Sequence, residues 1–266
     1  MHLRPVRMRR PGVTLRSAPG ARAAVYGAIW VEPSATGVRL SRLYLTARDE
    51  FYSIPLKILA DNVRIDHDTI TTVPNSICVL IGSDHPAERT LIEGNRIRNC
   101  GKTGKYDHLL YLQGSRDAVI RWNVLSANPG GWAVHLYPDA DRTLVEHNVI
   151  DGNQGGVVFA GDGAGTTSDL NLVRNNAITF SGPRWNVEGS WSDGPQGVGN
   201  AAEHNCVFSI GPDAPGGVAP PNGFTTADNP VVPGSPYLNR EGGDYRFLRD
   251  NPCIPLVGNV TAHLRR

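Results

Sequence analysis

The side chains best suited to proton transfer lie in the middle of the chain. His108, Tyr111 and His135 can each act as a general acid or base, and Lys105 and Arg184 lie beside the same segments. A lysine or arginine can also neutralise negative charge that develops on a substrate. These five residues are therefore the candidate catalytic set, and proton abstraction next to a carboxylate is the chemistry they suit.

Polar and aromatic side chains around this set are suited to binding a sugar polymer. Tryptophan and tyrosine faces pack against the apolar faces of sugar rings, while carboxylates and amides bond to hydroxyl groups. An extended row of such residues suits a polymer. The candidate substrate-binding residues are Asp107, Gln113, Trp132, Tyr137, Asp139, Asp162, Trp185 and Glu188.

Two reactions on a polysaccharide fit these residues. In β-elimination of a uronic-acid polymer, a cation or Ca²⁺ neutralises the substrate carboxylate, a base removes the adjacent C–H proton, and a tyrosine or histidine protonates the leaving oxygen. In hydrolysis by inversion, two carboxylates lie roughly 6.5–9.5 Å apart, and Asp139 and Asp162 are the candidate pair. Proton abstraction of a lyase or epimerase type is favoured, with Ca²⁺ as a candidate cofactor and no metal-ligating residues assigned.

Each candidate also has a structural explanation. His108 can cap the start of a strand, and His135 can be an exposed strand residue. Asp139 and Asp162 lie beside Gly and Pro, where aspartate commonly forms turns. The alternative hypothesis is therefore a non-catalytic carbohydrate-binding or structural protein. Catalysis requires the candidate residues to converge on one solvent-filled trough.

A repeated asparagine shows how the chain brings these residues together. The template apolar-apolar-polar-x-Asn-x-apolar recurs with Asn spacings of 28, 25, 28 and 29 residues. Asparagine bonds to backbone at turns and to other asparagines along a stack, so we interpret the row as structural. Asp68 and Leu43 occupy the same position in weaker upstream copies. The five asparagines are Asn95, Asn123, Asn148, Asn176 and Asn205.

Repeat units of this length predict a solenoid. Each unit has short β-branched runs between Gly, Asn, Asp and Pro, without an amphipathic stripe of helical length. Such a unit cannot bury its own apolar face, so neighbours must stack. We predict an all-β parallel β-helix of about seven or more coils, spaced about 4.8 Å apart. A leucine-rich repeat and a β-propeller fit the period less well.

The predicted coils place the candidate residues on one face. Alternation along each strand turns Leu110 and Val134 into the core. Tyr111 and His135 then face outward on adjacent coils, with backbones roughly 5 Å apart. Gly156, Val158 and Ala160 on the next coil are small and predict a shallow trough beside them.

The repeat resembles that of the right-handed parallel β-helix superfamily, the pectate-lyase-like fold, over roughly residues 12–210. Segments 12–20, 134–140 and 184–188 are similar to those of uncharacterised bacterial β-helix proteins. The resemblance implies a single-stranded, right-handed solenoid. It implies no single activity, because lyases, hydrolases, epimerases and proteins without known chemistry share this fold. Hydrolases of the fold usually have a paired Asp-Asp, which this chain lacks, so hydrolysis is the least favoured reaction.

Charge and hydropathy exclude several classes of protein. The 266-residue chain has a formal net charge of +1, which gives no indication of nucleic-acid binding. Its apolar runs are shorter than the roughly 18 residues that a membrane span needs. The expected partner is a polysaccharide or oligosaccharide, and the sequence does not indicate an oligomeric state.

The last part of the chain differs in composition. From residue 211 it is rich in Pro and Gly, so we expect 1–210 to form the solenoid and 211–266 a tail that packs back on it. The four cysteines allow three pairings. Cys206 and Cys253 could attach the tail to the last coil, whereas Cys78 is interpreted as a small core residue.

The N-terminus is basic and lacks the apolar region of a secretory signal. Segments 6–8 and 13–15 predict strands of an early coil, which leaves the first coil without a cap. We expect the natural protein to carry a further N-terminal segment. The expected location is secreted or cell-surface, and a disulfide would support export.

Overall fold

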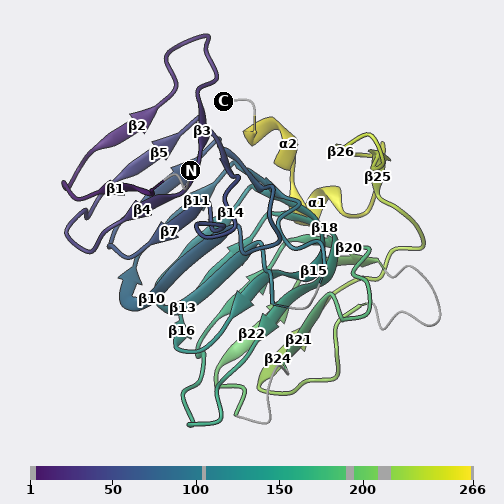
Figure 1. The fold of residues 1–266 in the computed structure, drawn as a ribbon. Helices are drawn as coiled ribbons and strands as arrows, with labels where there is room; N and C mark the ends of the chain where they lie inside the picture. The colour runs from purple at the N-terminus through teal and green to yellow at the C-terminus, as the bar shows by residue number, and fades with distance from the viewer. Residues whose placement is uncertain (1–3, 104–105, 190–194, 209–216, 265–266) are drawn as a thin grey trace.

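Short parallel strands wind into a β-solenoid of about eight turns (Figure 1). This computed structural model describes residues 4–103, 106–189, 195–208 and 217–264. The predicted all-β, right-handed parallel β-helix is confirmed. Within the described residues, no helix combines the length and apolar character needed to cross a membrane.

Three rows of strands form the faces of the solenoid, and the long strands β15 and β18 bend from the second row into the first. The first face contains β1 (Val6–Met8), β4 (Ile29–Val31), β7 (Leu56–Ile58), β10 (Val79–Glu88), β13 (Leu110–Arg116), the ends of β15 (Val124–Leu136) and β18 (Val149–Phe159), and β21 (Val187–Gly189). The second contains β3 (Ala24–Tyr26), β6 (Tyr44–Ala47), β9 (Thr69–Thr72), β12 (Arg96–Arg98), the starts of β15 and β18, β20 (Ala177–Thr179) and β23 (Cys206–Phe208). The third contains β2 (Thr14–Arg16), β5 (Arg39–Ser41), β8 (Arg64–Asp66), β11 (Leu91–Glu93), β14 (Val119–Arg121), β17 (Leu144–Glu146), β19 (Leu172–Arg174), β22 (Asn200–Glu203) and β24 (Phe224–Ala227). At a corner, β16 (Ala140–Asp141) pairs with the end of β13.

Apolar side chains stack in columns along the inside of each face. Residues in register on successive coils point the same way, because side chains alternate along each strand. On the first face the inward column is fully buried. It consists of Ile29, Leu56, Val79, Leu110, Val134, Val157 and Val187.

The repeated asparagines form a continuous hydrogen-bonded ladder. Asn95 donates from its backbone N–H (2.9 Å) and from Nδ2 (3.0 Å) to Oδ1 of Asn123 on the next coil. The Asn123 Nδ2 also donates to the backbone oxygen of Ile92. The same contacts repeat through Asn148, Asn176 and Asn205 to Asn229. The structural interpretation of the row is therefore confirmed.

The residue before each ladder position has a left-handed backbone. The φ angle is 58° at Trp122, 54° at His147 and 55° at His204. Side chains with a Cβ enter this region rarely, and asparagine and glycine tolerate it best. Gly94 and Asn175 fill two of the equivalent positions, so the turn geometry partly explains the composition of the repeat.

The chain after the last coil packs back along the second face. It contains β25 (Tyr237–Asn239), β26 (Asp244–Phe247), α1 (Ile254–Val257) and α2 (Val260–His263), drawn in yellow-green and yellow in Figure 1. Its apolar side chains bury Val124, Val149 and Ala177, which point outward from the solenoid. Apolar residues from 232 onward therefore lie against the solenoid. Parallel pairing extends to β24, and the division at residue 210 stays a prediction.

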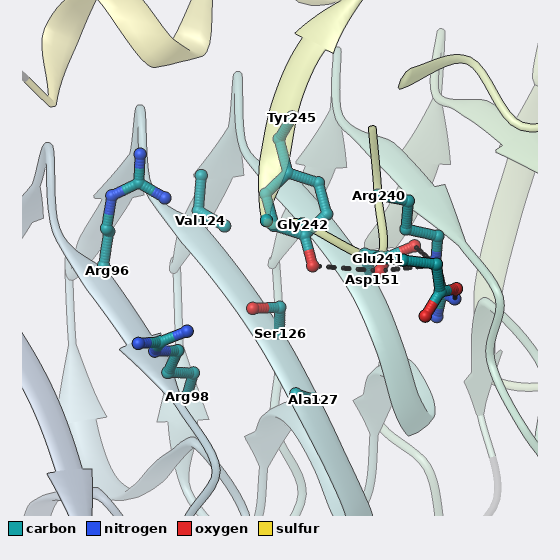
Figure 2. A pocket seen from close by; sticks show the side chains of 11 residues that line it. Arg96, Arg98, Val124, Ser126, Ala127, Asp151, Arg240, Glu241, Gly242 and Tyr245 are labelled. Carbon is teal, nitrogen blue, oxygen red and sulfur yellow. Dashed lines mark hydrogen bonds and ion pairs between the residues drawn. The ribbon is translucent and has the colours of Figure 1, made fainter. Parts of the chain in front are cut away.

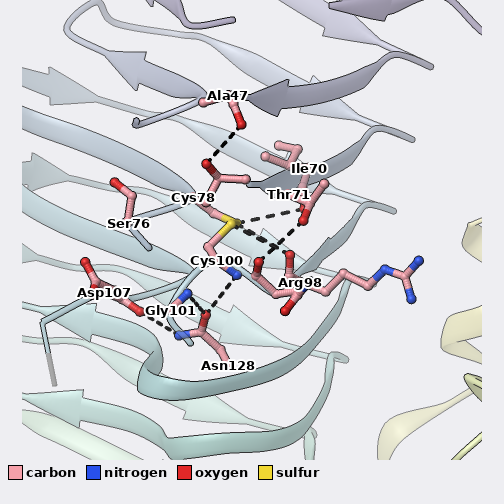
Figure 3. The surroundings of a disulfide bond; sticks show 12 residues. Ala47, Ile70, Thr71, Ser76, Cys78, Arg98, Cys100, Gly101, Asp107 and Asn128 are labelled. Atoms are coloured by element: carbon pink, nitrogen blue, oxygen red, sulfur yellow. Dashed lines mark hydrogen bonds between the residues drawn. A yellow bond between two sulfur atoms is a disulfide. The ribbon is translucent and has the colours of Figure 1, made fainter. Parts of the chain in front are cut away.

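Two disulfides join distant parts of the chain. Cys206 bonds to Cys253, so the expected link between the last coil and the tail is present. Cys78 lies in the buried core, as interpreted, but it is also bonded to Cys100, which the sequence did not indicate (Figure 3). Cys78 precedes β10 and Cys100 follows β12, and their Cα atoms lie 5.5 Å apart. The winding of the coils brings the two cysteines together, and their spacing along the chain does not predict this contact.

Candidate functional site

Adjacent coils bring Tyr111 and His135 side by side on the first face. Tyr111 on β13 is in register with His135 on β15, and their rings stack with centroids 5.2 Å apart. The ring of His108, just before β13, lies 4.3 Å from that of His135. The outward row continues through Val158 to Glu188. Three candidate catalytic side chains therefore meet on one face.

Hydrogen bonds define the proton positions on the two histidines. The backbone N–H of Trp132 donates to His108 Nδ1 at 3.2 Å, and His108 Nε2 lies 2.7 Å from His135 Nδ1. Since a backbone N–H is always a donor, neutral His108 carries its proton on Nε2 and donates it to His135. Neutral His135 then carries its own proton on Nε2. Both Nδ1 lone pairs are occupied, so the pair is arranged to donate rather than to accept a substrate proton.

Burial keeps the site residues uncharged. His108 is 2% exposed and His135 is 1% exposed. Burial lowers the pKa of His108 to about 3, and burial together with His108 lowers the pKa of His135 well below its ordinary value. Burial also raises the pKa of half-buried Tyr111 to about 12, with a contribution from Tyr137. The histidines lie beneath the surface and not in the solvent-filled trough that the catalytic hypothesis requires.

Trp132 connects the histidine pair to a buried carboxylate. Its indole N–H donates to Glu188 Oε1 at 2.8 Å, and Arg184 donates to the two oxygens of Glu188 at 3.0 and 2.6 Å. The Arg184 guanidinium also lies 5.3 Å from the Trp132 ring centroid. Burial, the largest influence on Glu188, raises its pKa although both hydrogen-bond partners lower it. Glu188 is therefore easier to protonate than an exposed carboxylate.

Bulky neighbours fill the place where a shallow trough was predicted. Val158 and Ala160 are fully buried and pack with Trp132 and Tyr137. Gly155 leaves room for the indole, because a Cβ there would lie 2.6 Å from Trp132 Nε1. The small residues thus accommodate Trp132. At 1% exposure its ring supports the site from beneath and offers no surface to a sugar ring.

An open hollow adjoins this cluster beside β21. It has a volume of about 260 Å³, and Arg184, Trp185, Glu188 and Asn222 are among its lining residues. The Arg184 side chain is 37% exposed. A cation, an aromatic side chain and a carboxylate that is easy to protonate therefore share a space open to solvent.

Three predicted substrate-binding carboxylates are engaged elsewhere. Asp107 accepts a hydrogen bond from Asn75, and burial raises its pKa. Asp139 has a left-handed backbone and pairs with Arg116 at 2.9 Å. Asp162 Oδ1 accepts two backbone N–H groups of its own loop, at 3.0 and 2.8 Å. Asp107 and Asp139 thus bond to neighbouring coils and Asp162 to its own turn, and these contacts lend no support to Asp139 and Asp162 as a hydrolytic pair.

The remaining candidates differ in position. Tyr137 is half-buried, and its ring lies 5.4 Å from His135 and 6.5 Å from Tyr111. Gln113 is half-buried and pairs with Gly82 just before the irregularity between β10 and β13. Lys105 lies outside the described residues, so its catalytic role stays a prediction.

Among the described residues, the candidate carboxylates do not converge on a Ca²⁺ site. Calcium needs six to eight oxygen ligands around one point. Glu188 is engaged by Arg184, Asp139 by Arg116 and Asp162 by its own loop. No group of three or more His, Cys, Asp or Glu in the described parts of the chain could hold a metal ion.

One set of charged residues on the second face was missed by the sequence analysis. Arg96 and Arg98 flank the buried Ile97 on β12 and point outward together. The alternation Arg-apolar-Arg was the available signal. This pattern alone does not indicate a basic cluster. The cluster forms because neighbouring coils place Arg22 and Arg42 around the same hollow as Arg96.

The fold and this site define a parallel β-solenoid protein with an acid–base cluster on one face. The family model described as a right-handed beta helix region matches residues 49–181, half of the chain, and the chain belongs to this family. A search of curated proteins found no match.

Two solved structures are similar in fold. One is the crystal structure of pectate lyase Pel9A, with 8% identity, a TM-score of 0.49, and coverage of 93% of this chain and 81% of that chain. The other is the catalytic unit of the thermostable GH87 alpha-1,3-glucanase from Streptomyces thermodiastaticus strain HF3-3. It has 16% identity, a TM-score of 0.40, and coverage of 86% of this chain and 46% of that chain.

Proposed function

We propose that this protein acts on a uronic-acid polysaccharide, by lyase-type or epimerase-type proton transfer on the first face. The observation that carries the proposal is the contact of Tyr111, His135 and His108, which Trp132 links to Arg184. Arg184 pairs with the sugar carboxylate and acidifies the adjacent C–H. Tyr111 is the least buried of the three and is neutral, so it protonates the leaving oxygen.

The histidine pair has a positioning role in this proposal. His108 donates to His135, and the His135 ring stacks on Tyr111, which fixes the phenol. The occupied Nδ1 atoms argue against either histidine as the base. Lys105 remains the candidate for proton removal.

The test is unsaturated-uronate absorbance on a panel of polyuronates, with and without Ca²⁺. Because an epimerase produces no such absorbance, deuterium uptake from D₂O into the polymer is followed by NMR. We expect Tyr111→Phe to lower kcat about 10²- to 10⁴-fold, the usual contribution of general acid–base catalysis. Tyr52→Phe, which removes a phenol at the N-terminal end of the solenoid beside Trp30, is the matched control and should be unchanged.

Non-catalytic carbohydrate binding is the second candidate. It is favoured by the burial of both histidines and by the lack of an open lone pair on either Nδ1. An intact protein that is silent in both assays but binds the polymer would establish this candidate and reject the catalytic one.

We also propose a secreted or cell-surface location. Disulfides persist in oxidising compartments, and the structure has two. Quantifying free thiols in protein isolated without reductant tests this, since reduced cysteines would contradict it.

A further inference from the structure

We propose that the second face carries a separate groove for an anionic, carboxylate-bearing polysaccharide, centred on Arg96 and Arg98. The groove lies on a different face from the Tyr111 site, and it can exist whether or not that site is catalytic. Its ligand is a chain of uronate-type sugars and not a single small ion.

Two hollows meet at Arg96. One, of about 280 Å³, lies between β12, β15 and the tail, and its lining includes Arg98, Ser126 and Tyr245 (Figure 2). The other, of about 310 Å³, is lined by Arg22, Arg42 and Thr69 among others. Arg96 lines both, so the hollows adjoin along the solenoid.

Cations outnumber ionised carboxylates around these hollows. The lining arginines are Arg22, Arg42, Arg96, Arg98 and Arg240, and the lining carboxyl groups are Asp68, Asp151 and Glu241. Asp68 is buried, which raises its pKa to about 8 and leaves it mostly neutral at pH 7. Five guanidinium groups therefore line the hollows with Asp151 and Glu241, both of which pair with Arg240, although the whole chain has a net charge of +1.

The exposed ends of the groove leave arginines available to a ligand. Arg22 is held by the Thr69 hydroxyl at 2.6 Å and lies 5.5 Å from the Tyr44 ring. Within the part of the chain that the structure describes, neither Arg22 nor Arg98 forms an ion pair with a carboxylate. An arginine without a carboxylate partner can offer both donors of its planar fork to one on a ligand.

The groove's chemistry fits a sugar acid. Arg96 and Arg98 project from alternate positions of one strand, about 7 Å apart along it, and so can meet charges on successive units of a polymer. Ser126, Thr69 and Tyr245 add polar groups to the lining between the arginines. An oligosaccharide presents both kinds of group along its length.

The tail forms one wall of the groove. Arg240 donates to the Asp151 oxygens at 3.0 and 2.9 Å, and the Tyr245 hydroxyl donates to Asp151 at 3.2 Å. Asp151 also accepts from Thr179 at 2.8 Å. Asp151 is 1% exposed and serves as the anchor for this wall, so its negative charge is already engaged.

The test measures binding of polygalacturonate by calorimetry to the full chain and to Arg98→Gln and the Arg22→Gln/Arg98→Gln double variant. Arg142→Gln, in the turn between β16 and β17 and paired with Asp117, makes the same charge change elsewhere. We expect at least a tenfold weaker Kd for Arg98→Gln, a larger loss for the double variant, and no change for Arg142→Gln. Matching thermal melts confirm that each variant is folded.

Binding of other polymers tests which chemical groups the groove recognises. Methyl-esterified polygalacturonate should bind at least tenfold more weakly, because it lacks the charge. Tighter binding of dextran sulfate would overturn a carboxylate ligand, and tighter binding of single-stranded DNA would overturn a polysaccharide. Unchanged binding by the double variant would overturn the groove. Loss of binding in Tyr111→Phe alone would assign the polymer to the first face, leaving the proposed function intact while rejecting this one.

Discussion

Asp68 occupies an asparagine position of the ladder with an ionisable group. Its Oδ1 accepts the N–H of Leu43 at 2.6 Å, and its own N–H donates to Asn95 at 2.8 Å. Its Oδ2 is buried and has no hydrogen-bond partner among the described residues. Burial raises the pKa of Asp68 to about 8. A proton on Oδ2 would let it donate as the amide nitrogen of Asn95 does.

This residue makes stability depend on pH. The unfolded carboxyl loses its proton above about pH 4, whereas the folded one keeps it to about pH 8. The folded state binds more protons in this window, so the contribution of Asp68 to stability falls as pH rises from 4 to 8. We expect Asp68→Asn to be more stable than wild type by about 1–3 kcal/mol at pH 8, the cost of a buried unsatisfied polar group. The variant should differ little at pH 4. Thermal melts across this range measure it, and parallel curves for the two proteins would refute it.

At the residue scale, the sequence predicted which side chains are neighbours better than it predicted how buried they are. Alternation of period two placed Tyr111 beside His135, as observed. The burial of His135 depends on Trp132, which fits only because residue 155 is glycine. Such a contact depends on how side chains of neighbouring coils pack, and a repeat template does not predict that packing.

The asparagine ladder is the main polar feature at the scale of elements. Asn148 is fully buried, bonds to Asn123 and Asn176, and donates to the backbone oxygen of Ile120. Replacing it leaves several buried backbone groups without partners. The template predicted this ladder because each turn repeats the same left-handed backbone before the asparagine.

We expect Asn148→Ala to lower the free energy of unfolding by about 2–4 kcal/mol, because more than one buried hydrogen-bond partner is orphaned. Asn229→Ala, at the half-exposed end of the ladder, should cost less than half as much, since water can replace its bonds. Urea denaturation gives both values. Equal losses at the two positions would contradict the ladder as a buried, cooperative element.

At the scale of the whole molecule, the tail completes the structure. Trp122 stacks on His147 of the next coil and on His263 of the tail. The ring centroids lie 4.4 and 4.0 Å from that of Trp122. The Cys206–Cys253 disulfide adds a covalent link with 47 residues of sequence separation. Composition predicted a tail, and the cysteine positions suggested its link to the last coil. The stacking on Trp122 was not foreseen, because it depends on where the chain end folds back.

We expect Cys206→Ala/Cys253→Ala to lower stability by about 2–4 kcal/mol, a usual range for a disulfide closing a loop of this size. Limited proteolysis should then cleave residues after 230 first, while the solenoid persists. Cys78→Ala/Cys100→Ala, which removes a bridge within the coils, is the comparison and should leave the tail protected. Equal tail cleavage in both double variants would show that this disulfide does not hold the tail.

The position of a bound uronate oligosaccharide in a crystal structure tests the central claim most directly. The account predicts a sugar carboxylate on Arg184, with a glycosidic oxygen within hydrogen-bond reach of the Tyr111 hydroxyl. A saturated complex whose sugar occupies only the second-face groove, or another surface, with the Tyr111 face unoccupied, would contradict it.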